Sequence, residues 1–226
     1  MPSVPQMFDR LALRYDLANS VLSFGRDRVW RNRVVRAVAK TEPLRILDVA
    51  CGTGALTFAL SDGIPSAELF AVDPSNDMRQ VAERRAKREG RYIEFAEAFE
   101  EDLPYEDASF DVVTNAFGIR NAKDRLRALQ EAKRVLKPEG TLHILEFGLP
   151  AGVVARTILL IGLWVFVPVV GAILTWNFSA YIYLARTIHS FLSAKAFEHL
   201  VLEAGFSSVS TSYMFLGLVR HVTASV

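Results

Sequence analysis

A glycine turn and two carboxylates are the residues of this chain best suited to binding a small ligand. Residues 46–54 read Ile-Leu-Asp-Val-Ala-Cys-Gly-Thr-Gly, and a second apolar run, Leu69-Phe-Ala-Val, is followed directly by Asp73. Glycines let the backbone approach a ligand without a Cβ, and a carboxylate can accept hydrogen bonds from both hydroxyls of a ribose. The order strand, glycine turn, helix and acid-capped strand predicts a nucleotide-type pocket at the carboxyl ends of parallel strands.

Details of the turn distinguish the possible cofactors. A dinucleotide site has Gly or Ala three residues after the second glycine, and here that residue is Thr57. Asp48 precedes the turn, where it would repel a pyrophosphate and attract the ammonium of an amino-acid group. S-adenosylmethionine has that ammonium and no phosphate, so we expect a class I methyltransferase. A nicotinamide or flavin fold, and a buried strand with an incidental glycine turn, remain as alternatives.

Short apolar runs alternate with amphipathic segments, which predicts an open, mostly parallel sheet. We expect an α/β class, with a Rossmann-like sheet of seven strands that ends in an antiparallel hairpin. One domain should cover residues 1–226, with an N-terminal helical lid over 1–40 and an apolar insertion over 151–192, after the fifth strand. The predicted strands are 45–49, 68–72, 92–95, 110–114, 141–147, 209–213 and 216–222, and the predicted core helices are 54–61, 75–89, 123–136 and 194–204.

Composition limits the class of partner. The 226 residues carry a net charge of +1, so the lysine and arginine excess typical of nucleic-acid binding is missing and we expect no nucleic-acid partner. Cys51 is the only cysteine, which excludes an intramolecular disulfide. No cluster of His, Cys and carboxylate has metal-ligand spacing, so we expect no metal. Without a signal-peptide pattern, a cytoplasmic protein is predicted.

The apolar insertion contains no charged residue between Arg156 and Arg186. By length alone it could span a bilayer, but a single crossing would separate the last strands from their sheet. We interpret it as broken helices, with Gly162, Pro168 and Gly171 as breakers, that roof the active site and touch the membrane surface. A buried core or oligomer interface, and true membrane insertion, remain as alternatives.

Three strings of residues carry a more specific signal. They are Phe8-Asp-Arg-Leu-Ala-Leu-Arg-Tyr-Asp-Leu-Ala-Asn19 with Leu22-Ser-Phe-Gly-Arg-Asp-Arg-Val-Trp-Arg31, then Ala116-Phe-Gly-Ile-Arg-Asn121, and Arg134-Val-Leu-Lys-Pro-Glu-Gly-Thr-Leu-His-Ile-Leu-Glu-Phe147. Over most of residues 8–149, and more loosely to about 206, the chain resembles the ubiquinone/menaquinone C-methyltransferase family.

The resemblance implies S-adenosylmethionine as cofactor and a reduced prenylated quinol, foremost demethylmenaquinol, as the lipid substrate. Because the apolar insertion would touch the membrane surface, we expect a cytoplasmic protein associated peripherally with the inner face of the membrane, and a homo-oligomer remains as an alternative. In place of the family's usual adenine-reading Asp or Asn before Leu-Pro, this chain offers either Glu97 with Ala98 or Phe99 with Glu100, and we favour Glu97. The predicted cofactor-binding residues are Tyr15, Arg28, Asp48, Gly52, Thr53, Gly54, Asp73, Pro74, Met78, Glu97, Ala98, Ala116 and Phe117.

Methylation of a ring carbon needs a reduced quinol, because a quinone ring is too electron-poor to attack a sulfonium methyl group. The ring hydroxyl must lose a proton, and we predict catalytic roles for Arg120, Asn121, Asp16 and His189. An arginine cannot be the base, but it can lower the pKa of a phenol or hold a hydroxide-like water. His189 would titrate near neutrality. Each of these residues also has a structural interpretation, as a surface cation, a helix cap or a packing group.

Two other functions remain open from sequence alone. A small or sterol-like acceptor could use the same cofactor fold, because fold does not determine the acceptor. Alternatively, the chain could bind S-adenosylmethionine without turnover, as a partner of a quinone-synthesis complex.

Overall fold

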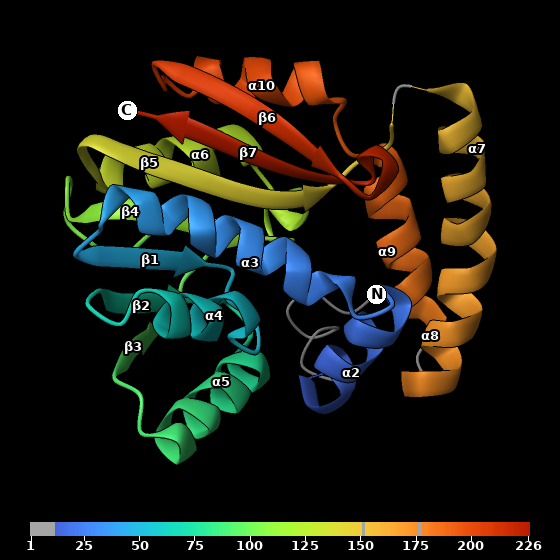
Figure 1. Cartoon of the computed structure of the whole chain (residues 1–226), viewed down its shortest axis with the longest axis horizontal. Helices are drawn as coiled ribbons and strands as arrows, with labels where there is room; N and C mark the ends of the chain where they lie inside the picture. The colour runs from blue at the N-terminus through green and yellow to red at the C-terminus, as the bar shows by residue number, and fades with distance from the viewer. Residues whose placement is uncertain (1–11, 151, 176–177) are drawn as a thin grey trace.

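A single sheet of seven strands, in the order β3-β2-β1-β4-β5-β7-β6, organises the chain (Figure 1). The computed structural model describes residues 12–150, 152–175 and 178–226, although not the side chains of residues 12–15 and 175. Strands β1 to β5 are parallel, and β7 runs antiparallel between β5 and β6. The predicted α/β class, with a mostly parallel sheet and a terminal antiparallel hairpin, is confirmed.

Most element boundaries agree with the predicted ones to within a few residues. The strands are β1 Arg45–Val49, β2 Glu68–Val72, β3 Ile93–Ala96, β4 Phe110–Ala116, β5 Leu136–Phe147, β6 Ser208–Met214 and β7 Val219–Ser225. The helices are α2 Ala12–Leu22, α3 Arg26–Val38, α4 Ala55–Gly63, α5 Asn76–Glu89, α6 Arg125–Val135, α7 Val153–Ile161, α8 Val167–Thr175, α9 Phe178–Ser190 and α10 Ala194–Glu203. Short 3-10 turns are η1 Ala39–Thr41, η2 Ile119–Asn121 and η4 Phe215–Gly217, and η3 Gly162–Phe166 is a π-helical turn.

Helix ends are set by local side-chain chemistry. Ser75 accepts a hydrogen bond from the amide of Met78 at the start of α5, and Gly90 ends that helix in the left-handed region. Asp124 accepts from the amide of Arg127 at the start of α6. These caps satisfy amides that have no partner within the helix, and so they fix where each helix begins beside the sheet.

Apolar side chains bury both faces of the sheet. On one face Trp30 and Val34 of α3 pack with Leu56 and Leu60 of α4. On the other face α6 and α10 contribute most of the cluster, whose fully buried members include Leu129, Phe197 and Val201. Because both faces are covered, the open surface for a ligand lies at the carboxyl ends of the strands, where α2, α8 and α9 gather in Figure 1.

The described part of the predicted N-terminal lid is helical and consists of the two helices α2 and α3. The backbone turns between α2 and α3 at Phe24 and Gly25, whose φ angles are 53° and 72°. The ring of Phe24 stacks on that of Phe166 at 5.8 Å between centroids, so the lid touches the apolar insertion at this turn. Residues 1–11 of the predicted lid lie outside the described residues.

The apolar insertion is more continuous than predicted. Gly162 does not break the helix; it begins the π-helical turn η3, which leads directly into α8. Pro168 lies in the first turn of α8, where the widened turn before it accommodates a residue that has no amide donor. Gly171 serves close packing instead, because a Cβ there would lie 2.3 Å from the ring of Tyr181 on α9. The prediction that these three residues break the insertion into separate helices was therefore wrong.

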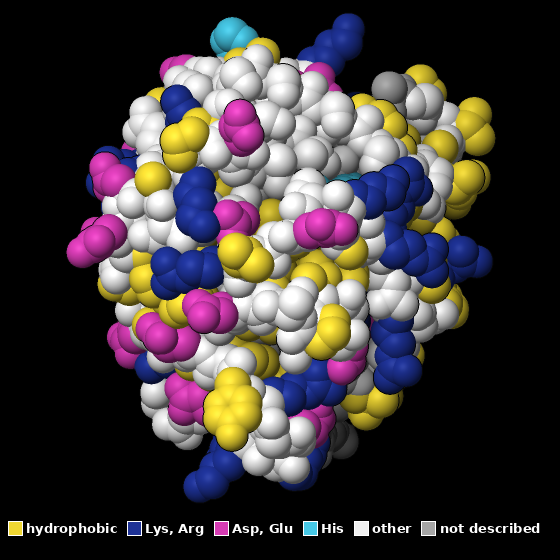
Figure 2. All heavy atoms as spheres, turned by 60° about the vertical axis from the view of Figure 1, so that its left-hand side comes forward, with side chains coloured by type: hydrophobic (Ala, Val, Ile, Leu, Met, Phe, Trp, Pro, Cys, Tyr) yellow, Lys and Arg dark blue, Asp and Glu magenta, His cyan; other side chains and the backbone are white. Residues whose placement is uncertain are grey.

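The outer face of the insertion is exposed and apolar. Within the described residues one helix, Val153–Leu174, is long and apolar enough to cross a membrane by length and composition. Exposed side chains on it include Val153, Val154, Ile161, Val165 and Ile173. Figure 2 shows hydrophobic side chains along the right-hand edge of the molecule, with Lys and Arg side chains beside them.

Two strand boundaries differ from prediction for backbone reasons. Strand β5 begins at Leu136 and passes through Pro138 and Gly140, which were expected to end a helix in a loop. The last strand begins at Val219, not residue 216, because Phe215, Leu216 and Gly217 all have positive φ and form the turn η4. Neither change moves the carboxyl end of a parallel strand, so the site is positioned as the sequence implied.

Candidate active site

The turn between β1 and α4 presents its backbone to the ligand edge of the sheet. Ala50, Gly52 and Gly54 have φ angles of 55°, 57° and 82°. A Cβ on Gly54 would lie 2.6 Å from the Phe58 ring, so glycine is required there. The amide of Cys51 donates to the carbonyl of Val72 at 3.0 Å, which holds the turn against the end of β2.

Asp48 lies beneath this turn and is almost fully buried. Its carboxylate accepts hydrogen bonds from the hydroxyls of Thr57 at 2.6 Å and Thr114 at 2.7 Å. Burial outweighs these two bonds and raises the pKa of Asp48 to about 6. The carboxylate still lines the cavity above it, so a ligand ammonium there would find an anionic partner that protein donors do not neutralise.

Asp73 follows β2 and faces the same cavity. One carboxylate oxygen accepts from the amide of Gly52 at 2.7 Å and the other from the amide of Ser75 at 2.8 Å. Carboxylate oxygens are suitable acceptors for the two vicinal hydroxyls of a ribose. These backbone bonds fix the orientation that a ribose would need.

The lid reaches the turn through one hydrogen bond. The hydroxyl of Thr53 donates to Asp16 on α2 at 2.6 Å. Thr53 is buried and Asp16 lines the cavity, so α2 covers the ligand side of the glycine turn. Asp16 therefore sits against the cofactor side of the site.

The segment after β3 corrects the predicted adenine contact. Glu97, which the sequence favoured, points outward and pairs with Arg79 at 2.9 Å, and neither Glu97 nor Ala98 lines the cavity. Phe99 and Glu100 line it instead. Glu100 accepts from the amide nitrogen of Asn115 at 3.2 Å, and its Oε2 is buried without a partner among the described residues. Burial raises the pKa of Glu100 to about 8, so near neutral pH it is a neutral acid that can both donate and accept.

These residues surround a cavity of about 480 Å³, which we call the cofactor cavity. Gly54 shapes the turn without lining the cavity, the Tyr15 side chain lies outside the described residues, and Arg28 is exposed on α3 away from the lining. Within the described part of the chain, no three His, Cys, Asp or Glu side chains are grouped as metal ligands. The predicted site residues that line the cavity are Asp16, Asp48, Gly52, Thr53, Asp73, Pro74, Met78, Ala116, Phe117 and Asn121.

A second cavity of about 380 Å³ adjoins the first, and we call it the apolar cavity. Its wall comes mainly from the lid, the insertion and the turn before β7, with Trp30, Leu163, Phe166, Leu184 and Phe215 among its side chains. The residues that line both cavities are Asn19, Asp27, Arg31 and Phe117. A ligand extending from one cavity to the other would therefore pass these four side chains.

Phe117 forms part of this boundary in an unusual backbone conformation. Its φ of 61° is rare for a bulky residue, and such strain persists only where the surroundings enforce it. Its amide donates to the carbonyl of Leu145 at 2.7 Å, and its ring centroid lies 4.4 Å from that of Phe147. The conformation directs the ring toward the apolar cavity while the backbone stays at the cofactor cavity.

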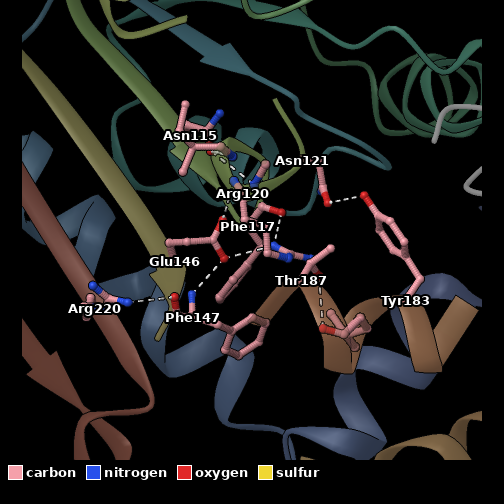
Figure 3. Close-up of polar contacts among 12 residues, drawn as sticks. Asn115, Phe117, Arg120, Asn121, Glu146, Phe147, Tyr183, Thr187 and Arg220 are labelled. Carbon is pink, nitrogen blue, oxygen red and sulfur yellow. Dashed lines mark hydrogen bonds and ion pairs between the residues drawn. The ribbon is translucent and has the colours of Figure 1, made fainter. Parts of the chain in front are cut away.

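Arg120 is buried in an ion pair, not free at the mouth of the site (Figure 3). Its Nη1 lies 2.9 Å from Glu146 and also donates to the carbonyl of Phe117. Glu146 accepts as well from the amides of Arg120 and Phe147. Arg120 lines the apolar cavity, so the pair shapes its wall and brings positive charge close to it.

Asn121 and His189 have different surroundings. The side-chain carbonyl of Asn121 accepts from the hydroxyl of Tyr183 on α9 at 3.1 Å, which connects the edge of the cofactor cavity to the insertion (Figure 3). His189 is exposed, accepts from the indole of Trp164 at 3.2 Å and lines neither cavity. The position of His189 therefore does not support the predicted catalytic role.

Sequence reasoning missed several residues that the fold brings to the site. Thr57 was treated as a departure from a glycine pattern, yet it donates to Asp48 from α4. Thr114 was placed only as a strand residue. Asp27 and Arg31 were quoted within a signature string without a role; only their i,i+4 spacing on a helix, with opposite charges, indicated a pair.

Comparison with known proteins identifies the family of this chain. The ubiE/COQ5 methyltransferase family matches residues 2–224. A demethylmenaquinone methyltransferase of Thermus thermophilus is 40% identical over 201 residues, which covers 89% of this chain and 91% of the relative. The enzyme of the same description from Thermotoga maritima is 41% identical, covering 89% and 86%. A ubiquinone/menaquinone biosynthesis C-methyltransferase UbiE of Geotalea daltonii is 37% identical, covering 97% and 94%.

Solved structures share the fold at lower identity. A Thermotoga maritima SAM-dependent methyltransferase, described as a possible histamine N-methyltransferase, has a TM-score of 0.67 at 20% identity and covers 97% of this chain and 98% of its own. Phosphoethanolamine N-methyltransferase 2 of Haemonchus contortus, solved in complex with S-adenosyl-L-methionine, has a TM-score of 0.59 at 17% identity and covers 81% and 48%. At these identities the likeness supports the fold alone.

We predict that cofactor affinity depends on pH through the ionisation of Asp48. If its carboxylate binds the ammonium of S-adenosylmethionine, affinity should rise as the pH increases through about 6, because only the ionised form attracts the cation. Asp48→Asn should weaken binding by roughly 10- to 100-fold above that pH, the worth of a hydrogen bond to a charged group. Calorimetric titration of the wild type and variant between pH 5 and 8 measures both effects.

Thr57→Val provides the matched control. Because the hydroxyl of Thr57 lowers the pKa of Asp48, its removal should move the midpoint of the affinity curve to higher pH without abolishing the curve. A wild-type curve that is flat between pH 5 and 7, or one that survives unchanged in Asp48→Asn, would contradict the assignment.

Proposed function

Because the chain belongs to the ubiE/COQ5 methyltransferase family, we propose that it transfers a methyl group from S-adenosylmethionine to a ring carbon of a reduced prenylated quinol. The enzyme is a class I methyltransferase, and its cofactor is S-adenosylmethionine. Demethylmenaquinol is the acceptor we propose, since relatives at 40% and 41% identity are described as demethylmenaquinone methyltransferases. The observation that carries a lipid acceptor is the apolar cavity beside the cofactor cavity.

The residues of the cofactor cavity fit the parts of S-adenosylmethionine. Asp48 offers negative charge for the ammonium, and Asp73 offers two oriented carboxylate oxygens for the ribose. Glu100 offers a buried oxygen that has no partner among the described residues. When bound, the cofactor supplies an electrophilic methyl group on a sulfonium. The neutral acid of Glu100 suits the adenine edge, where a ring nitrogen accepts and an amine donates.

The apolar cavity fits a prenylated ring better than a small polar acceptor. Aliphatic and aromatic side chains from α2, α3, η3 and α9 form most of its wall. Three of its polar side chains, those of Asn19, Asp27 and Arg31, also line the cofactor cavity. A quinol head would therefore place its hydroxyl at the polar boundary and its isoprenoid tail against the insertion.

The decisive experiment is an assay with labelled S-adenosylmethionine and reduced acceptors. We expect label in the lipid when demethylmenaquinol is supplied, and none when the same compound is kept oxidised, because the quinone ring cannot attack. The benzoquinol counterpart and a sterol are the comparison acceptors. Label transferred only to a sterol or small molecule would favour the alternative acceptor, and cofactor binding without transfer to any acceptor would favour a non-catalytic partner.

Leu163 tests whether the apolar cavity holds the tail. This side chain is buried in η3 and lines the cavity, so Leu163→Trp should fill part of the tail path. We expect KM for long-tailed demethylmenaquinol to rise about 10-fold or more, a loss of roughly 1.4 kcal/mol of binding, with little change for a tail-less naphthoquinol. Steady-state kinetics with both substrates measures the difference.

Val165→Trp is the control for that variant. Val165 lies in the same turn but is exposed and lines neither cavity, so the same substitution should leave both KM values unchanged. An equal loss for the long-tailed and tail-less substrates in Leu163→Trp would argue that the cavity does not hold the tail.

We also propose that the enzyme works peripherally at the inner face of the membrane, where its substrate resides. The helix Val153–Leu174 supports this proposal. Its outer face is exposed and apolar, and its inner side lines the apolar cavity. Exposed arginines on α3, namely Arg26, Arg28, Arg33 and Arg36, have no carboxylate within 4.0 Å among the described side chains and can pair with lipid phosphates. An exposed apolar helix together with exposed basic side chains is typical of proteins that bind anionic bilayer surfaces.

Aspartate substitutions on the exposed helix test membrane binding. Ile161 and Ile173 are exposed and line neither cavity, so Ile161→Asp with Ile173→Asp should reduce binding to phosphatidylglycerol vesicles at least about 10-fold while preserving activity on a tail-less quinol. Tyr92→Asp with Leu202→Asp, on exposed positions elsewhere, is the matched control. Co-sedimentation with vesicles measures binding, and equal binding by both double variants would contradict the proposal.

A further inference from the structure

Methylation of a quinol requires a group that takes the proton of the ring hydroxyl. We propose that Asp27 is that group, a catalytic base positioned at the boundary of the two cavities. The inference rests on the proposed function, since it presumes a phenolic acceptor. Asp27 is not among the residues for which the sequence predicted a catalytic role, which are Arg120, Asn121, Asp16 and His189.

The boundary between the two cavities limits where such a base can lie. The reacting carbon must lie where cofactor and acceptor meet, so a base for the adjacent hydroxyl should line both spaces. The shared lining consists of Asn19, Asp27, Arg31 and Phe117. An amide and an aromatic ring are not bases, and a guanidinium is always protonated. Asp27 is the member of this set that can accept a proton.

Asp27 is also the only carboxylate in the lining of the apolar cavity, within the residues described. The other ionisable side chains there are Arg31, Arg120, Tyr181 and Tyr183. The arginines cannot act as bases. Tyr183 already donates its hydroxyl to Asn121, and burial raises its pKa, which makes it a poorer base near neutral pH.

Other nearby carboxylates are less well placed. Glu146 lines neither cavity and is bound to Arg120. Asp16, Asp48, Asp73, Glu100 and Glu101 line the cofactor cavity alone, beside Cys51 and Lys123. A ring hydroxyl in the apolar cavity therefore meets Asp27 before any of these groups.

The carboxylate of Asp27 is held rigidly. Its side chain is 8% exposed, and one oxygen accepts from the hydroxyl of Ser23 at 3.0 Å. The other oxygen forms an ion pair with Arg31, one turn further along α3. Each oxygen retains a lone pair after these contacts, so the group is oriented without being saturated. Such an oriented, partly satisfied carboxylate at a cavity wall is suited to receive a proton.

The proton balance is simple. As the phenolic O–H bond breaks, its proton moves to a carboxylate oxygen of Asp27, and its electron pair shifts through the ring to the ortho carbon. That carbon forms the new C–C bond with the methyl group, while the S–CH₃ pair remains on sulfur and leaves it neutral. The ring is then a methylated dienone with one hydrogen on the same carbon. Loss of that hydrogen to water, with return of the proton from Asp27 to oxygen, restores the aromatic quinol.

A carboxylate is a strong enough base for this step. A resting phenol holds its proton far more tightly than a carboxylate does. As the C–C bond forms, however, the ring becomes electron-poor and its hydroxyl becomes a strong acid. Proton transfer coupled to methyl transfer therefore needs only a nearby, oriented acceptor.

Asp27→Asn is the first test, because it keeps the shape and removes the basic oxygen. We expect kcat on reduced demethylmenaquinol to fall about 10²- to 10⁴-fold, the usual contribution of general base catalysis, with the Kd for S-adenosylmethionine unchanged. Asp27→Glu keeps a carboxylate and should retain more activity than Asp27→Asn. Asp62→Asn, at a surface salt bridge with Arg91, is the matched control and should behave as wild type.

Acceptor acidity separates a base from a structural residue. With naphthols whose electron-withdrawing substituents leave the hydroxyl ionised at the assay pH, the deficit of Asp27→Asn should shrink about 10-fold or more. A deficit that stays the same for every acceptor, or a variant with wild-type kcat, would overturn the role of Asp27 while leaving the proposed function intact. Absence of turnover of any quinol by the wild type would overturn the proposed function itself.

Discussion

The site depends on one buried carboxylate that joins three elements. Asp48 lies near the carboxyl end of β1, and the hydroxyls of Thr57 on α4 and Thr114 on β4 both donate to it. These bonds fix the glycine turn relative to the sheet and leave the carboxylate anionic beneath a cavity. Burying that charge is unfavourable, as the raised pKa of Asp48 shows, and a cationic ligand would relieve the cost. The apo protein is thus prepared for a positively charged partner.

Local patterns predicted the sheet, because its strands are short apolar runs between turn residues, and β1 and β2 have the predicted bounds. The same patterns gave wrong predictions where contacts between residues far apart in the sequence determine the structure. Gly171 looked like a breaker, yet its missing side chain makes room for Tyr181 on another helix. Glu97 looked like a ligand contact, yet Arg79 draws it outward. Neither partner can be identified from spacing along the chain.

The sequence predicted a set of residues for the catalytic region but not how their side chains contact one another. Arg120 was expected at the site and does line the apolar cavity, but its ion pair with Glu146 depends on a contact between β5 and η2 that no motif reveals. Asp27 belongs to the boundary only because α3 packs beside both cavities. The two cavities therefore meet along a narrow line of side chains, three of them from the lid.

The wide sequence separation of the residues that line the apolar cavity affects the order in which the two cavities form during folding. The glycine turn and the acids after β1, β2 and β3 lie within residues 45–121, and the bond between Asp48 and Thr114 joins positions 66 residues apart. The apolar cavity instead brings together residues 19–31, 158–188 and 215–218. Contacts of such wide sequence separation are slow to form, since loop closure must precede them. We expect a folding chain to acquire the ability to hold its methyl donor before it can receive a lipid.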